Sequence, residues 1–302
     1  MNLWQQYIRP ETVADAVTAL TSAPGPALPI GGGTDIMLDL HQGRHSPVHT
    51  IVDLTGIPEM KILEIRDGRL FIGAGVAISH IALHPLAALY ARALTEACDL
   101  IGGPQVRNVA TLGGNVAHAL PAADGTISLM CLDAEAEVAG VAGRRRMPLP
   151  ELFLGPGKSA LKLGDVIVGF YLPLAKPGEA SAFKRIMRPQ GVALPIINLS
   201  VWLSRSGDTS SPHPGPLPQG EGIKQIRIAV GPGGSVPFRA RNTEAFLAAK
   251  AYSPENFTAA LDILLEEIKF RTSAQRATAE YRRHLVGTLL RNTLAAAWER
   301  AE

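Results

Sequence analysis

The sequence predicts an α+β protein of two domains, and three observations lead to this prediction. Apolar residues recur at helical spacing in several segments, and short apolar runs bounded by glycine or proline lie between them. The length of 302 residues, with 46% hydrophobic residues, suits two domains of about 150 residues each. Residues 173–178 have the composition of a linker. We therefore expect domains at residues 1–176 and 177–302.

The first subdomain, about residues 1–56, is expected to contain a β-α-β unit. Apolar residues recur every three or four positions from Val13 to Leu20, which predicts a helix that ends before Pro24. A short apolar run at residues 27–30 leads into three consecutive glycines, and a second run at residues 50–54 ends at Gly56. Both runs are predicted to be strands.

The second subdomain, about residues 57–176, begins with a predicted β-hairpin. The dipeptide Asp67-Gly68 separates two short apolar runs and favours a two-residue turn. The predicted elements of this subdomain are strands at residues 62–65, 69–72, 134–141 and 165–172 and a helix at residues 87–101.

The domain at residues 177–302 is predicted to combine strands with C-terminal helices. Ser253-Pro254 supplies an N-cap followed by proline at the first helical position. Residues 206–222 contain four Pro and four Gly and little to bury, so we expect a mobile surface insertion. The other predicted elements are strands at residues 182–186, 196–203 and 226–230 and a last helix at residues 274–298.

Charge and cysteine content exclude several classes of function. The net charge of +2 and 5% aromatic residues do not suit nucleic-acid binding. The arginines at residues 144–146 are interpreted as a solvated hairpin tip, and contact with an acidic partner or a nucleotide phosphate is the alternative. Cys98 and Cys131 fit no metal-binding spacing, and we find no export signal or membrane span. We expect a cytoplasmic protein without a metal site of its own.

Two glycine-rich segments carry the strongest functional signal. Backbone N–H groups can surround a pyrophosphate where no Cβ blocks the approach, and hydroxyl and amide groups add uncharged donors. Either segment alone is more readily a tight turn, but together they favour a dinucleotide site. The first segment consists of Pro29, Ile30, Gly31, Gly32, Gly33, Thr34 and Asp35, and the second of Thr111, Leu112, Gly113, Gly114 and Asn115.

Two aspartates accompany these segments. Asp124 follows Asn115 by nine residues and is suited to accept hydrogen bonds from sugar hydroxyls. Asp35 would repel a phosphate, so we expect its side chain to point away or to fix the loop.

Longer stretches of the sequence resemble a known family. QVRNVATLGGNVA at residues 105–117, followed by PAAD at residues 121–124, resembles the second FAD motif in the flavoprotein subunits of molybdenum hydroxylases. These subunits form the xanthine dehydrogenase and carbon monoxide dehydrogenase family, and GGGTD at residues 31–35 resembles their first FAD motif. The resemblance continues in order through residues 155–161, 182–185, 237–240 and 281–283.

This resemblance implies a fold and a set of cofactor contacts. The fold is a two-subdomain FAD-binding domain of the vanillyl-alcohol oxidase type, followed by an antiparallel sheet and helices. Residues 29–35 and 111–115 would hold the FAD pyrophosphate, and Asp124 would hold sugar-chain hydroxyls. Ile101, Ile167 and Lys184 would lie around the flavin ring or the adenosine. A cation such as Lys184 near the flavin would favour its reduced, negatively charged form.

The resemblance also implies partner subunits. These are a small subunit with two [2Fe–2S] clusters and a large molybdopterin subunit, assembled as a dimer of heterotrimers. Electrons would pass from the clusters through FAD to NAD⁺, oxygen or a quinone, and no side chain of this chain is assigned a catalytic role. The alternatives are a free-standing FAD-dependent oxidase or dehydrogenase and a binding protein that uses the fold without flavin.

Overall fold

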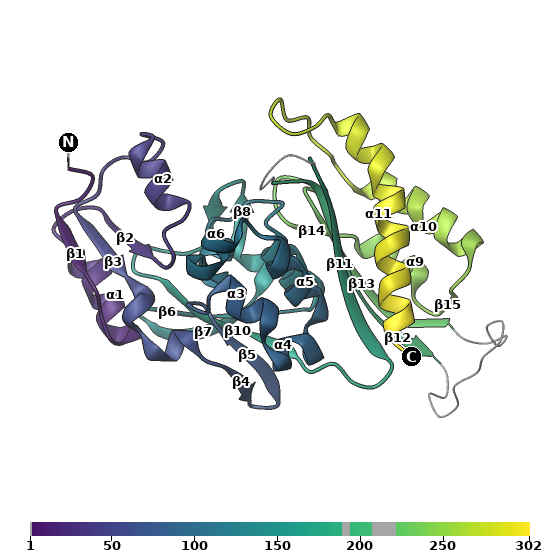
Figure 1. Cartoon of the computed structure of the whole chain (residues 1–302), viewed down its shortest axis with the longest axis horizontal. Coiled ribbons are helices and arrows are strands. Elements are labelled where there is room, and N and C mark those ends of the chain that lie inside the picture. The colour runs from purple at the N-terminus through teal and green to yellow at the C-terminus, as the bar shows by residue number, and fades with distance from the viewer. Residues whose placement is uncertain (1, 189–193, 207–221) are drawn as a thin grey trace.

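A computed structural model describes residues 2–188, 194–206 and 222–302 (Figure 1). The N-terminal part contains a parallel sheet and an antiparallel sheet, and the C-terminal part contains a second antiparallel sheet covered by helices. The predicted insertion at residues 206–222 falls between the last two long strands, and its residues 207–221 lie outside the described residues.

The parallel sheet has the strand order β1-β3-β2. Helix α1 begins after Thr12, whose side chain accepts a hydrogen bond from the Asp15 N–H and so caps the helix. The predicted β-α-β unit is present, with a short helix between its strands. The elements are β1 (Gln6–Ile8), α1 (Val13–Ser22), β2 (Ala27–Ile30), α2 (Ile36–His41) and β3 (Thr50–Asp53).

The second sheet is antiparallel with the order β4-β5-β10-β6-β7. Its first hairpin turns at Asp67 and Gly68, which both have positive φ, at 53° and 68°, as the predicted two-residue turn requires. The strands are β4 (Leu63–Arg66), β5 (Arg69–Gly73), β6 (Glu135–Gly140), β7 (Gly143–Pro148) and β10 (Val166–Pro173). A separate small pair consists of β8 (Phe153–Gly155) and β9 (Lys158–Ser159).

The predicted helix at residues 87–101 is wrong in one respect, because it is two helices. Helix α4 (Pro85–Tyr90) ends and α5 (Arg92–Leu100) begins at Ala91, whose φ of −140° and ψ of 48° are not helical. Behind this break, the N–H of Ala93 donates to Ser181 Oγ in the C-terminal part at 3.1 Å. The periodicity of the sequence does not reveal this break, because neither glycine nor proline marks it and apolar residues recur on both sides of it.

The interpretation of the three arginines as a hairpin tip is also wrong. They lie along β7, and the turn before that strand is at residues 141–142. Because each guanidinium already has a carboxylate partner in this chain, the alternative of an acidic partner loses its support. The pairs are Arg144–Glu59 at 2.8 Å, Arg145–Asp165 at 2.6 Å and Arg146–Asp67 at 3.0 Å.

Four further short helices lie in the N-terminal part, and the sequence pattern did not predict them. They contain six to eight residues each, too few to display a helical repeat. All eight residues of α8 are buried, so that helix has no polar face to reveal it. The helices are α3 (Ile78–Leu83), α6 (Pro104–Val109), α7 (Leu112–Ala117) and α8 (Asp124–Cys131).

The C-terminal sheet is antiparallel with the order β11-β12-β13-β14, and β15 pairs with β13. Helix α11 begins at Ala279, five residues later than predicted, because Thr278 caps it and Ser273 and Ala277 form a β-bridge before it. The elements are β11 (Glu179–Met187), β12 (Pro195–Ser206), β13 (Gly222–Gly231), β14 (Phe238–Arg239), α9 (Arg241–Leu247), β15 (Lys250–Ala251), α10 (Pro254–Glu267) and α11 (Ala279–Arg300).

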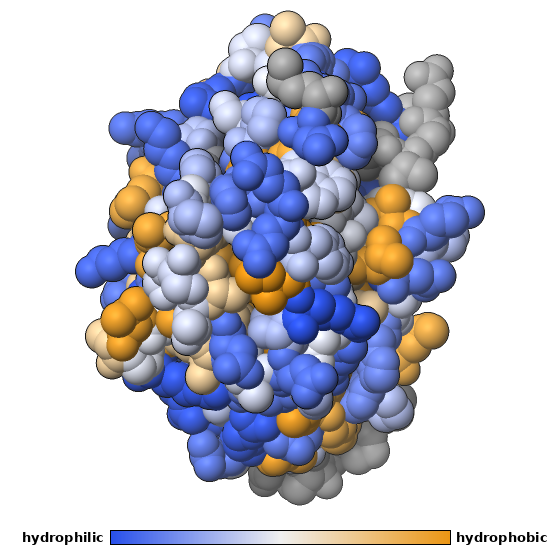
Figure 2. All heavy atoms as spheres, turned by 90° about the vertical axis from the view of Figure 1, so that its left-hand side faces the viewer, coloured by the Kyte–Doolittle hydropathy of each residue, from blue (hydrophilic) through white to orange (hydrophobic). Residues whose placement is uncertain are grey.

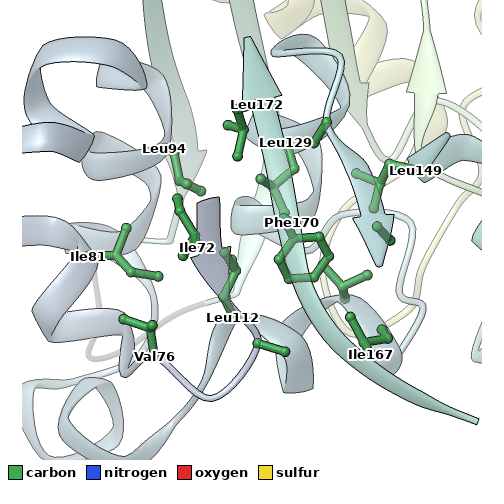
Figure 3. Close-up of a cluster of buried hydrophobic side chains, with 14 of the residues drawn as sticks. Ile72, Val76, Ile81, Leu94, Leu112, Leu129, Leu149, Ile167, Phe170 and Leu172 are labelled. Carbon is green, nitrogen blue, oxygen red and sulfur yellow. The ribbon is translucent and has the colours of Figure 1, made fainter. Parts of the chain in front are cut away.

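The C-terminal sheet is covered on both faces. Helix α11 packs on one face of β11 and β12, and α5 and α8 of the N-terminal part pack on the other (Figure 1). The buried apolar residues form one large cluster in each part of the chain. Figure 3 shows the N-terminal cluster, in which Phe170 of β10 lies among side chains from several elements. The sheet thus joins the two parts.

The outer surface of the N-terminal part is mainly hydrophilic. Figure 2 shows this face, on which apolar residues form separate small groups. Among the helices that the structure describes, none combines the length and the apolar character needed to cross a bilayer. Cys98 and Cys131 are both free thiols and buried.

Candidate cofactor site

The structure brings the two glycine-rich segments into contact. Pro29 and Ile30 end β2, residues 31–35 connect it to α2, and Thr111 is the N-cap of α7. A Cβ at Gly31 would lie 2.6 Å from Thr111 Oγ1, and one at Gly32 would lie 1.9 Å from the carbonyl oxygen of Val109. Both distances are far below van der Waals contact, so the two segments can meet only because residues 31 and 32 lack side chains.

The first segment offers free backbone donors. Within residues 2–188, 194–206 and 222–302, the N–H groups of residues 31–35 have no hydrogen-bond acceptor. Gly33 has a φ of +67°, which turns the chain into α2 and favours glycine. Residues 31–34 are half-buried, so ligand atoms can reach them. Such a run of unpaired N–H groups is a concave site for an anion.

The second segment is built differently, because its own N–H groups are already bonded. The Gly113 N–H donates to the Ala74 carbonyl at 2.8 Å, and the Gly114 N–H donates to Thr111 Oγ1 at 3.1 Å. Gly113 packs closely, since a Cβ there would lie 2.7 Å from the Cβ of Ala74. The Thr111 hydroxyl still has its own proton to donate. This segment therefore supplies close packing and a hydroxyl group instead of a set of backbone donors.

Asn115 links the second segment to α8. Its Oδ1 accepts the Thr126 N–H at 3.1 Å, so the start of α8 is held against α7. A Cβ at Gly125 would lie 2.8 Å from the same oxygen, which explains why the small residue is needed there. The Nδ2 group of Asn115 has no acceptor among the described residues and is left as a donor at the site.

The Asp35 carboxylate lies beside His118 and fixes the first segment to the end of α7. Asp35 Oδ2 is 3.7 Å from His118 Nδ1, and the Asp35 side chain is 63% exposed. The contact lowers the pKa of Asp35 and raises the pKa of His118. The imidazole is thus favoured as a cation beside the free donors of residues 31–35.

Replacing His118 by glutamine is expected to change the pH dependence of stability. Because the folded-state pKa of His118 is raised, the pair stabilises the protein fully below about pH 6.5 and ceases to do so as pH rises through that raised pKa. At the acid end the contribution is lost as pH falls through the lowered pKa of Asp35. The pair is partly exposed, so we expect about 0.3 kcal/mol. Thermal unfolding of both forms at about pH 6 and pH 9 measures it, and an equal difference at both pH values would contradict it.

Asp124 is the first residue of α8 and is almost fully buried. Its carboxylate accepts from Arg185 Nη1 and from Asn198 Nδ2, both at 2.5 Å. Burial raises the pKa of Asp124, and the charge of Arg185 opposes that rise. The sequence analysis missed Arg185 and Asn198, because strands β11 and β12 bring them to α8 from more than 60 residues away.

The remaining three candidates lie on separate elements. Ile101 follows α5 and is half-buried, and its carbonyl accepts from Arg107 Nη1 at 3.3 Å. Ile167 is buried in the same apolar cluster as Leu112 of the second segment (Figure 3). Lys184 is exposed on β11. Since side chains alternate along a strand, Lys184 points away from the face on which Arg185 reaches Asp124.

No cluster of three or more His, Cys, Asp or Glu side chains that could hold a metal ion occurs in the described part of the chain. The donors that converge are backbone amides, hydroxyls and an amide side chain, with the His118 imidazole, whose pKa is raised by Asp35, beside them. This set fits the phosphates of a dinucleotide, which bring their own negative charge. The fold and these donors are those expected of a protein that binds a dinucleotide.

Comparison with known proteins specifies the family. A family described as the FAD binding domain in molybdopterin dehydrogenase matches residues 3–175, and the CO dehydrogenase flavoprotein C-terminal domain matches residues 181–297. The chain belongs to this family of FAD-binding oxidoreductase subunits.

Individual relatives align over almost the whole chain. The putative xanthine dehydrogenase FAD-binding subunit of Escherichia coli strain K12 is 28% identical, over 96% of this chain and 95% of its own length. The nicotine 6-hydroxylase medium subunit of Paenarthrobacter nicotinovorans is also 28% identical, over 98% of both chains. A solved structure of carbon monoxide dehydrogenase from Hydrogenophaga pseudoflava superposes with a TM-score of 0.88 at 26% identity, covering 98% of each chain. The predicted resemblance and fold class are confirmed.

Proposed function

We propose that this chain is the electron-outlet subunit of a heteromeric molybdenum hydroxylase. In this role it receives electrons from [2Fe–2S] clusters of a small partner subunit, and a large molybdopterin subunit oxidises the substrate. The observation that carries the proposal is the run of free N–H donors at residues 31–35, packed against the second FAD motif in a chain of this family. The medium subunit of nicotine 6-hydroxylase is a relative over its full length.

We assign different residues of the site to different parts of FAD. We assign the pyrophosphate to the backbone amides of residues 31–35, with Pro29 and Ile30 leading into them from β2. The Thr111 hydroxyl and the Asn115 amide donate from the opposite side. Gly113 lets this segment pack closely against Ala74, and we assign it and Gly114 to the pyrophosphate side of the site. Asp124 is assigned to the sugar chain, and Ile101 and Ile167 to the apolar surroundings of the rings.

FAD, when bound, accepts electrons singly from iron–sulfur clusters and passes two of them to an acceptor such as NAD⁺, oxygen or a quinone. The side chains of this chain bind and orient it and set how tightly each of its charge states is held. We assign no catalytic side chain to this chain. The substrate is recognised by the large subunit.

The assembly, the location and the domain boundaries are further parts of the proposal. We propose a dimer of heterotrimers in the cytoplasm, where the two free thiols remain reduced. We also propose a domain boundary near residue 176 and a subdomain boundary near residue 56. The separate apolar clusters of the N-terminal and C-terminal parts support the first boundary.

Lys184 lies on the face of β11 opposite to Arg185, so replacing it by methionine lowers the reduction potential of the bound flavin only if the flavin ring reaches that face. A nearby ammonium group stabilises the reduced, negatively charged form, and its loss would shift the potential by about 10 to 30 mV for an exposed side chain. Spectroscopic redox titration of the FAD-loaded protein measures this shift. An unchanged potential together with unchanged FAD affinity would remove Lys184 from the cofactor site.

The function is tested by co-purification. The tagged chain, expressed together with the genes that adjoin its own, is expected to carry FAD and to bring down polypeptides that contain iron and molybdenum. A chain that shows no flavin absorbance after reconstitution would contradict the FAD assignment. A flavoprotein that purifies alone and oxidises a small molecule by itself would identify a free-standing oxidase instead.

A further inference from the structure

The Asp124 carboxylate is held at a junction between the two parts of the chain. Arg185 of β11 and Asn198 of β12 are paired on adjacent strands of the C-terminal sheet. Both side chains donate hydrogen bonds to the Asp124 carboxylate. Asn198 Nδ2 also donates to the Ala122 carbonyl at 3.0 Å, next to the start of α8. The start of α8 is in turn bonded to Asn115 through Thr126. The second FAD motif and the C-terminal sheet are thus joined through one carboxylate.

The side chain of Arg185 is directed to this junction by strand alternation. Ser181, Phe183 and Arg185 all face the N-terminal part: Ser181 accepts the Ala93 N–H, and Phe183 packs in the N-terminal cluster. The Arg185 side chain is 6% exposed and the Asp124 side chain 5% exposed. A buried carboxylate without a cation is strongly destabilised. Asp124 therefore depends on Arg185 for its charge.

The groups around Asp124 supply no other cation. Within the described residues, Arg185 is the only positively charged side chain within ion-pair distance of Asp124. The neighbouring titratable group from α5 is the buried thiol of Cys98, whose pKa burial raises, so it stays neutral. Asn198 contributes a neutral amide.

Two polar atoms at this junction find no hydrogen-bond partner in the described part of the chain. Arg185 Nε and Asn198 Oδ1 are buried and have no hydrogen-bond partner among the described residues. Buried polar atoms are nearly always paired in finished structures, so one unpaired donor and one unpaired acceptor beside a cofactor motif point to a missing polar group. A hydroxyl group can accept from Arg185 Nε or donate to Asn198 Oδ1, so a cofactor hydroxyl suits either atom.

We propose that Arg185 is a positioning residue for FAD: it keeps Asp124 ionised and oriented toward the sugar-chain hydroxyls. In this arrangement Asp124 accepts a cofactor hydroxyl with its remaining lone pairs, and Arg185 and Asn198 hold the carboxylate from behind. The inference rests on the proposed function, because it takes FAD as the ligand. It makes FAD binding depend on a residue of the C-terminal domain.

The test compares R185Q, R185K and D124N for FAD affinity between about pH 6 and pH 9, by quenching of flavin fluorescence. We expect R185Q to bind FAD about 10- to 100-fold more weakly near neutral pH, because a charge-assisted contact is lost. Its affinity should rise with pH as Asp124 ionises, and this rise should be larger and lie at higher pH than any rise in the unaltered protein, in which Arg185 lowers the pKa of Asp124. R185K, which keeps the charge, should recover part of the affinity.

Two further variants separate a positioning role from a structural one. D124N should bind weakly at every pH, and D124N/R185Q should be no weaker than D124N, because both substitutions remove the same interaction. R227Q is the matched control: Arg227 of β13 bridges to Asp133, just beyond the other end of α8, at 2.8 Å. It should lower the melting temperature without changing FAD affinity.

The inference is overturned if R185Q binds FAD like the unaltered protein at every pH, or if the two penalties add in the double variant. A loss of FAD affinity in R185Q that is the same at all pH values and equal to that in R227Q would also overturn it. Failure of the unaltered protein to bind FAD would instead contradict the proposed function.

Discussion

Alanine at position 32 is expected to yield a protein that purifies without FAD. The new Cβ would lie 1.9 Å from the Val109 carbonyl oxygen and 2.7 Å from the Ala110 Cα. Both neighbours are backbone atoms, so neither can move without displacing the second glycine-rich segment. Overpacking of this kind costs about 3 kcal/mol, and if the loops separate to relieve it, FAD affinity falls about 100-fold.

The measurement is the flavin content of purified G32A, followed by titration of the flavin-free form with FAD. G234A is the control, because a Cβ at Gly234 would come no closer than 4.0 Å to the Val236 carbonyl oxygen. G234A should keep full flavin content. If G32A retained flavin at the same level, the two glycine-rich segments could not form a single site.

Replacing Arg239 by methionine is expected to destabilise the protein by about 3 to 5 kcal/mol. The Arg239 side chain is 6% exposed and pairs with the buried Glu244 at 2.6 Å and with Asp133 at 2.7 Å. It also donates to the Met130 carbonyl at the end of α8, at 3.0 Å. Removing it leaves the Glu244 carboxylate buried with the Ile228 N–H as its close donor. The substitution also removes the hydrogen bond from Arg239 to Met130, which links the C-terminal sheet to α8.

Thermal and urea unfolding of R239M measure this effect, and we expect a melting temperature about 10 °C lower. R241M is the matched control. Arg241 also approaches Glu244, but at 3.7 Å and with a side chain that is 66% exposed, so its loss should cost less than about 1 kcal/mol. Equal effects of the two substitutions would show that burial does not determine the strength of these pairs.

Local patterns predicted much of the fold. The strand at residues 27–30 and the turn at Asp67-Gly68 follow from short-range chemistry, since a turn with positive φ selects its own residues. Helix α10 begins where Ser253 caps it. The break at Ala91 and the paired arginines of β7 could not be predicted, because both depend on residues at least 20 positions away in the chain.

In the candidate site, too, local patterns predicted some features, and contacts between distant residues decided the others. The sequence indicated both glycine-rich segments, because glycine is required wherever backbones approach this closely. It treated the two segments as equivalent, whereas the structure leaves donors free in the first and uses those of the second internally. It also singled out Lys184, although the neighbouring Arg185 is the residue that reaches Asp124. Strand register decides this, and a shift of one residue reverses the two side chains.

By itself, the sequence determined the family, the cofactor class and the local elements, because each follows from residues close together in the chain. The tertiary structure decided which backbone amides remain free, which cation pairs with Asp124, and how α8 joins the N-terminal and C-terminal parts of the chain. These features arise from hydrogen bonds and ion pairs between distant segments. A local pattern records which groups a segment contains, but their partners are set only when the sheets and helices pack.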